Sequence, residues 1–148
     1  MSDLFELTLM VVVYCLLVVL VVMIHYEFLN KLFSYLPRLD INHRRRIAVG
    51  VCGALLAHTI EVWVFAIAYY FINKSEGWGY LEGNFDGSLL DCGYFSFTTF
   101  TTLGFGDIQP FGDIRYLTGI ESLTGLVLIT WTASFLYLEM QRYWSNEE

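Results

Sequence analysis

The stretch FTTFTTLGFGD, Phe97 to Asp107, places four threonines and two glycines in a chain that is 56% hydrophobic. Irregular backbone at membrane depth leaves peptide groups without helical partners, and it persists only where protein buries it or where it lines water. Glycine adopts left-handed backbone without steric cost, so Gly104 and Gly106 allow successive carbonyls to point toward one axis. Such a column of oxygens can replace the hydration shell of a cation. The stretch therefore predicts a cation-binding loop within a membrane.

The chain around this loop has the composition of a membrane protein. Its 148 residues are 18% aromatic and have a mean hydropathy of +0.53, which is more apolar surface than a soluble domain of this length can bury. Residues 4–24, 47–72 and 117–140 are each long and apolar enough to cross a hydrocarbon core. Residues 89–101 are too short to cross and are expected to re-enter. The sequence predicts an all-α membrane protein with three transmembrane helices.

Lysines and arginines between the first two spans predict the orientation. Lys31, Arg38, Arg44, Arg45 and Arg46 lie there, and an excess of positive charge belongs on the cytoplasmic side. The chain is then expected to be a multi-pass protein of the cell (plasma or inner) membrane, with its N-terminus outside and its C-terminus in the cytoplasm. Beside a membrane span, the three consecutive arginines are expected to bind anionic lipid headgroups and not nucleic acid. The formal net charge of −7 favours cations as the ions attracted.

The stretch FTTFTTLGFGD resembles the pore helix and selectivity filter of potassium channels, with TLGFG in place of the commoner TVGYG. The GFG form also occurs in that family, including two-pore-domain channels. The resemblance extends over residues 47–142 and implies a passive, potassium-selective ion channel with no cofactor other than bound potassium ions. One pore segment per chain implies a homotetramer, because the family builds each pore from four such segments.

The resemblance also implies roles for single residues. The ion-coordinating oxygens would come from Thr102, Leu103, Gly104, Phe105 and Gly106, with potassium bound at the first four. Asp107 would stand just above them at the outer mouth. Pro110 falls where the family has a proline after the filter.

On this basis the chain divides into three parts. Residues 1–25 form a peripheral, lipid-facing transmembrane helix that lacks the basic residues of a voltage sensor. Residues 26–46 form an amphipathic helix at the cytoplasmic interface and a basic linker. Residues 47–143 form the pore domain, with an outer helix at 47–72, an outer loop at 73–88, a pore helix at 89–101, the filter at 102–107 and an inner helix at 117–141.

Residues near the filter depart from the family pattern. Phe105 lacks the phenol hydroxyl of the usual tyrosine, and Phe95 stands where many relatives have a tryptophan that bonds it. Apolar contact between the two rings then replaces a hydrogen bond. Thr98 occupies a position that is glutamate in some bacterial members, and Tyr94 is a further candidate for filter support. We hypothesise a filter that is less rigidly braced and therefore able to gate.

The third span carries residues that bear on permeation. Thr130 and Ser134 share a helical face and are expected to line the cavity below the filter, unless their hydroxyls bond back to their own helix. Gly125 lies near the hinge glycine of relatives and could equally permit close helix packing. Glu121, near the outer end of this span, could attract cations or bond the back of the filter.

His58 and Glu61 are two ionisable residues near the middle of the second span, on one helical face. Such groups are costly in a membrane and by default suggest function. One interpretation is a proton-sensitive pair behind the pore helix, with Glu61 replacing the carboxylate missing at Thr98. The other is a neutral carboxyl satisfied by His58 or by a pore-helix threonine. We favour this second, purely structural interpretation.

Other functions fit the sequence less well. If the altered bracing loosens the filter, the chain would form a weakly selective monovalent cation channel. A non-conducting membrane subunit would keep the pore fold but carry no ions. An intramembrane enzyme using His58 and Glu61 would need a nucleophile motif or a second cluster of metal ligands, and the sequence has neither pattern. We therefore expect no catalytic residue.

Overall fold

The computed structural model describes residues 2–75 and 77–144. Most of the described chain is helical, and three of its helices are long and apolar enough to cross a membrane, which confirms the predicted class of all-α membrane protein. The elements in chain order are α1 (Ser2–Tyr35), the short 3-10 helix η1 (Leu36–Arg38), α2 (His43–Asn73), β1 (Tyr80–Gly83), α3 (Leu89–Phe100), β2 (Ile108–Phe111) and α4 (Ile114–Trp144).

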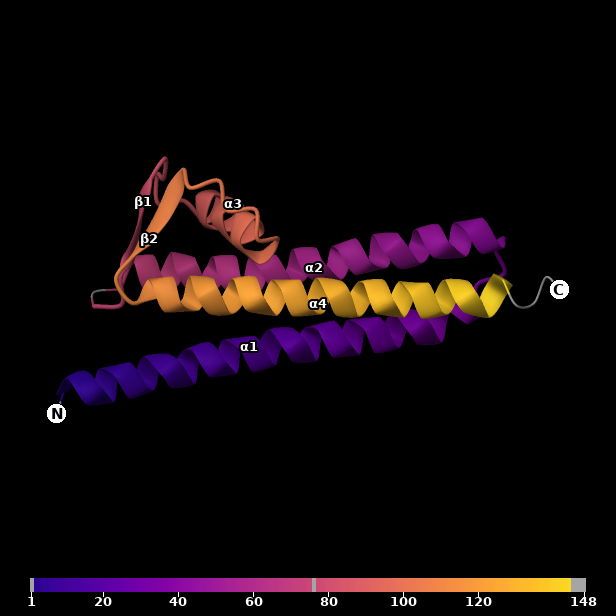
Figure 1. Ribbon diagram of the computed structural model, residues 1–148, viewed down its shortest axis with the longest axis horizontal. Helices are drawn as coiled ribbons and strands as arrows, with labels where there is room; N and C mark the ends of the chain where they lie inside the picture. Colours follow the sequence, from indigo (N-terminus) through magenta and orange to yellow (C-terminus); the bar gives the residue numbers. More distant parts are fainter. Residues whose placement is uncertain (1, 76, 145–148) are drawn as a thin grey trace.

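The three long helices lie side by side, and β1, α3 and β2 collect toward the end where α2 finishes and α4 begins (Figure 1). α2 and α4 are neighbours, and α1 packs on both. α3 also packs on α2 and α4, beside the two-stranded sheet of β1 and β2. With 12 residues, α3 is about 18 Å long and cannot cross a hydrocarbon core of about 30 Å.

α1 is a single helix, where the sequence suggested a span ending near residue 25 and a separate interfacial helix. No glycine precedes Gly50 and no proline precedes Pro37, so no helix-breaking residue occurs until Pro37 enters η1. The 34 residues of α1 reach about 51 Å, which exceeds the thickness of a hydrocarbon core. The later part of the helix packs on the bundle through buried Leu29 and through Phe33, which meets Phe135 of α4 edge-on.

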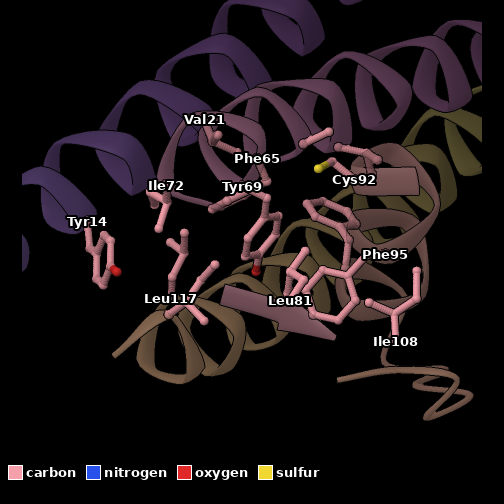
Figure 2. Close-up of a cluster of buried hydrophobic side chains, with 14 of the residues drawn as sticks. Tyr14, Val21, Phe65, Tyr69, Ile72, Leu81, Cys92, Phe95, Ile108 and Leu117 are labelled. Carbon is pink, nitrogen blue, oxygen red and sulfur yellow. The ribbon is translucent and has the colours of Figure 1, made fainter. Parts of the chain in front are cut away.

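A buried apolar cluster joins α3 to the rest of the molecule (Figure 2). Cys92, Phe95 and Phe100 of α3 are at most 4% exposed. Within a membrane such packing stabilises through dispersion and close fit, because lipid tails are as apolar as the side chains. The cluster therefore fixes where α3 lies against its neighbours. Residues from the other elements include Tyr14, Phe65, Leu81, Ile108 and Leu117.

A two-stranded sheet joins the segment that the sequence predicted as an outer loop to the residues after the TLGFG stretch. β1, within the predicted loop, pairs antiparallel with β2 in a register that sets Gly83 opposite Ile108. Gly83 has a φ of +116°, and a Cβ there would lie 2.2 Å from the carbonyl oxygen of Asp107. The Asn84 amide donates to the same oxygen at 2.9 Å. The sheet therefore holds the backbone that directly follows the TLGFG stretch.

Gly125 is the point where α4 touches the end of α3. A Cβ at this position would lie 2.1 Å from the carbonyl oxygen and 2.9 Å from the Cγ atom of Phe100. No side chain fits at that separation unless the helices move apart. Of the two roles considered for Gly125, the structure supports close packing.

Gly125→Ala should destabilise the fold by about 1–3 kcal/mol, the usual cost of overpacking. The measurement is the Tm of the purified protein in detergent. Gly119→Ala is the matched control, because it lies on the same helix and no atom lies within 4 Å of the added Cβ. It should leave the Tm unchanged or raise it slightly, since alanine favours a helix over glycine by about 1 kcal/mol. Equal Tm values for the two variants would contradict the close packing.

Candidate functional site

α3 precedes and positions residues 102–106, which we call the TLGFG segment. The helix is capped by Ser88, whose hydroxyl accepts the Asp91 amide at 3.1 Å. It ends at Phe100, one residue before the predicted end. Thr102 then has a φ of +59°, a left-handed value that cannot continue an α-helix. The cap and the stop together set where the irregular backbone begins.

The backbone of the TLGFG segment alternates in hand. Thr102, Gly104 and Gly106 have φ values of +59°, +51° and +79°, whereas the two residues between them do not adopt positive φ. The left-handed conformation predicted at the two glycines is present, and it begins one step earlier at Thr102. The Gly104 amide donates to the Thr98 carbonyl of α3 at 3.0 Å. All five residues of the segment are exposed in the single chain. Alternation of this kind can direct successive carbonyls to one axis.

Tyr94 links α3 to the outer end of the segment. Its ring stacks on Phe105 with centroids 6.4 Å apart, and its hydroxyl donates to the Asp107 carboxylate at 2.8 Å. This bond raises the pKa of Tyr94 above its usual value, so the phenol remains a donor over the ordinary pH range. Phe95, expected to brace Phe105, is buried against Tyr69 of α2 instead. Within the chain the bracing ring is therefore Tyr94, and the brace includes a hydrogen bond in place of the purely apolar contact that we hypothesised.

Glu121 ties α4 to the two helices around it. Its carboxylate accepts the Tyr69 hydroxyl of α2 at 2.6 Å and the Ser96 hydroxyl of α3 at 2.5 Å. Glu121 is 0% exposed, so it has no contact with solvent from which to attract cations. Of the two roles considered, bonding behind the segment is the one that the structure supports, through α3. The sequence did not single out Tyr69 or Ser96, because spacing along one helix carries no signal of partners on another.

A second buried carboxylate, Glu61, joins α1 to α2. Its two oxygens lie 2.8 Å from Nδ1 of His25 and 2.9 Å from Nδ1 of His58. The predicted pairing with His58 is present, but the other partner is a histidine of α1 and not a threonine of α3. Thr98 donates to the Phe95 carbonyl of its own helix, so Glu61 does not replace a carboxylate there. His25 was missed because residues 1–25 were interpreted as lipid-facing, although an ionisable residue at the end of a span is itself a signal.

Thr130 and Ser134 lie on an exposed face of α4. The Thr130 hydroxyl donates to the Val127 carbonyl, and the Ser134 hydroxyl donates to the Thr130 carbonyl, each at 2.9 Å. This is the back-bonded arrangement that the sequence left as an alternative. The hydroxyl oxygens remain on the exposed face as acceptors, because each hydroxyl has used only its proton.

The basic residues at the start of α2 lie at the opposite end of the bundle from the β1–β2 sheet (Figure 1). Arg44 and Arg45 are exposed. Arg46 is half-buried, and its guanidinium donates to the Leu39 carbonyl at 2.9 Å. Two of the three guanidinium groups are thus open to contact with headgroups.

The region that holds these sites is also matched by a protein-family model. A model described as an ion channel matches residues 57–141, which is more than half of the chain. The chain belongs to the ion channel family. No curated protein and no solved structure matches it.

The ion channel match begins within α2 and runs through α3 and the TLGFG segment into α4. Membership establishes an ion channel domain in a membrane protein, and it disfavours the intramembrane enzyme considered above. α1 lies outside the matched residues. Only the contacts within this chain therefore show how α1 packs on the channel domain.

Removing Glu121 should loosen α3 in the channel. Glu121→Leu leaves the Tyr69 hydroxyl with only a 3.5 Å contact to the Thr118 hydroxyl, whereas the Ser96 hydroxyl keeps the Val62 carbonyl at 2.9 Å. A buried group that loses its partner costs about 1–3 kcal/mol, so we expect the free energy of unfolding, measured in mixed micelles, to fall by about that amount. Glu121→Gln keeps the size and one acceptor oxygen and should lose less. Equal losses in the two variants would show that volume, and not the hydrogen bonds, holds α3.

Tyr94→Phe removes the bond to Asp107 and keeps the ring on Phe105. A hydrogen bond to a charged group is worth about 1.5–3 kcal/mol, and about 1.4 kcal/mol is a factor of ten in an equilibrium. We expect single-channel openings in planar bilayers to become shorter by about tenfold or more. Tyr80→Phe removes the hydroxyl of a half-exposed tyrosine on β1 and should leave open times unchanged. Unchanged open times in Tyr94→Phe would mean that this bond does not brace the open segment.

Proposed function

We propose that this ion channel is a passive, potassium-selective pore whose filter is the TLGFG segment. The observation that carries the proposal is the left-handed backbone at Thr102, Gly104 and Gly106, which alternates with ordinary backbone at Leu103 and Phe105. Such a segment can present a ladder of oxygens that replaces the hydration shell of a potassium ion. Potassium ions would bind from Thr102 to Phe105 as the transported species, and the proposal requires no cofactor.

The pore is proposed to be a homotetramer. One chain carries one TLGFG segment, so a ring of oxygens requires several copies. Leu103 and Phe105 are 58% and 63% exposed in the single chain. Two large apolar side chains would then stay exposed beside the proposed path of the ions. Contact with neighbouring copies would cover both side chains, and the resemblance to potassium channels supplies the number of copies.

We propose an orientation in the membrane from the residues that lie at the two ends of the bundle. Arg44, Arg45 and Arg46 mark the α1–α2 connection, and the TLGFG segment lies in the half of the bundle away from it (Figure 1). We propose that this connection and the C-terminus face the cytoplasm, with the N-terminus and Asp107 outside the cell membrane. The exposed arginines would then bind anionic lipid headgroups, and nucleic acid has no role.

Reversal potentials under potassium and sodium gradients test the proposal. In liposome-derived bilayers the current should reverse near the potassium equilibrium potential, about 59 mV for a tenfold gradient. Gly104→Ala forces a side chain into left-handed backbone at a cost of about 1–2 kcal/mol and should abolish selectivity or current. Gly77→Ala, at a positive φ with no atom within 4 Å of the added Cβ, is the matched control and should conduct normally.

The alternatives give different results in the same assay. Reversal near zero with both cations present would indicate a weakly selective cation channel. Absence of current from correctly assembled protein would indicate a non-conducting subunit. A purified particle with a stoichiometry other than four would overturn the tetramer.

A further inference from the structure

The buried cluster around Glu61 brings together three side chains of the kinds that bind metal ions. One ring nitrogen of His25, one ring nitrogen of His58 and a carboxylate oxygen of Glu61 all lie within 4.8 Å of one another. His25 and Glu61 have side chains that are 0% exposed, and His58 is 17% exposed. The sequence offered only two of these groups, and the third comes from α1 through the fold.

We propose that His25, His58 and Glu61 form a binding site for a divalent transition metal ion of the zinc class, which clamps α1 to α2. Two imidazoles and one carboxylate are the protein ligands of many zinc sites that keep a fourth position for water. Imidazole nitrogen favours zinc, cobalt, nickel and copper, whereas magnesium and calcium prefer oxygen ligands. The donor set therefore selects transition metals over the alkali and alkaline-earth cations.

The distances suit an ion with only small movements of the side chains. Nδ1 of His25 and Nδ1 of His58 lie 2.8 Å and 2.9 Å from the two oxygens of Glu61. Ligand atoms around a tetrahedral zinc ion with bonds of about 2.0 Å stand about 3.3 Å apart. An ion between the three groups would open these two separations by a few tenths of an ångström, while the two nitrogens would close on it.

A partner for the other nitrogen of His25 is already present. Metal-bound histidines usually bond their second ring nitrogen to a nearby acceptor, which fixes the tautomer. Nε2 of His25 lies 3.4 Å from the hydroxyl oxygen of Thr132 on α4. When Nδ1 binds the metal, neutral His25 carries its proton on Nε2. That N–H then donates a hydrogen bond to the hydroxyl oxygen of Thr132. The buried hydroxyl of Thr132 thus lies where a zinc site needs a supporting group.

Aromatic rings of α3 and α4 pack against the two histidines of the cluster. The His25 ring lies 5.2 Å from Trp131 of α4, and the His58 ring lies 5.8 Å from Phe100 at the end of α3. Trp131 and Tyr26 also line a neighbouring cavity of about 230 Å³. A bound ion would therefore join α1 to α2 beside the end of α3.

The test uses the 148-residue chain without a histidine tag, purified from cells grown with zinc and then stripped with a chelator. We expect about one zinc per chain before stripping, and four-coordinate d–d absorption bands when cobalt is added back. Zinc should also raise the Tm of the stripped protein. His25→Ala should weaken zinc binding by about 100-fold or more, because changing even the partner behind a metal ligand typically costs about 10–100-fold.

Two further variants separate metal binding from loss of fold. Thr132→Val keeps all three ligands and should weaken zinc binding by about 10–100-fold. His43→Ala removes a histidine at the start of α2, far along the helix from His58, and should bind zinc as the wild type does.

Failure to bind zinc or cobalt by folded protein would overturn the proposal and leave a hydrogen-bonded network. Zinc binding that persists in His25→Ala and Thr132→Val would also overturn it, as adventitious binding elsewhere. Potassium flux through the same stripped and zinc-loaded samples is a separate readout, so loss of the metal site and loss of the channel are distinguishable.

Discussion

Unpaired backbone at membrane depth is the constraint on which the rest of this structure depends. From Leu103 to Asp107 the chain has no helical ladder, and peptide groups without partners cost several kcal/mol each in hydrocarbon. Such a segment persists only if the surrounding protein holds it and something polar meets its open side. α3 supplies the first support, because its Thr98 carbonyl accepts the Gly104 amide.

The remaining supports come from different parts of the chain. Glu121 holds α3 from behind through hydroxyls of α2 and α3. Tyr94 holds Asp107 from the side, and β1 approaches the Asp107 carbonyl at Gly83. Each contact joins residues well separated in sequence. The alternating backbone is therefore a property of the folded ion channel and not of the five residues alone.

α1 lies outside the region that defines the family, yet it is attached to that region at two levels. Near one end, the Tyr14 ring packs with Trp78 and Tyr116. Deeper in the bundle, His25 meets Glu61. Polar contacts between helices in a membrane are worth only about 0.6–2 kcal/mol, so their main effect is to select one register of α1 against the channel domain.

The sequence by itself determined the membrane class, the number of spans, the short helix that cannot cross, and the left-handed glycines. These depend on length, hydropathy and the missing Cβ, all of which are local. It did not determine which side chains meet: Phe95 was expected to brace the segment where Tyr94 does, and His25, Tyr69 and Ser96 were missed. A polar group on an apolar helix indicates only that it needs a partner. Only the tertiary structure decides which one, because a donor and an acceptor must come within about 3 Å, and the packing of separate helices sets that distance.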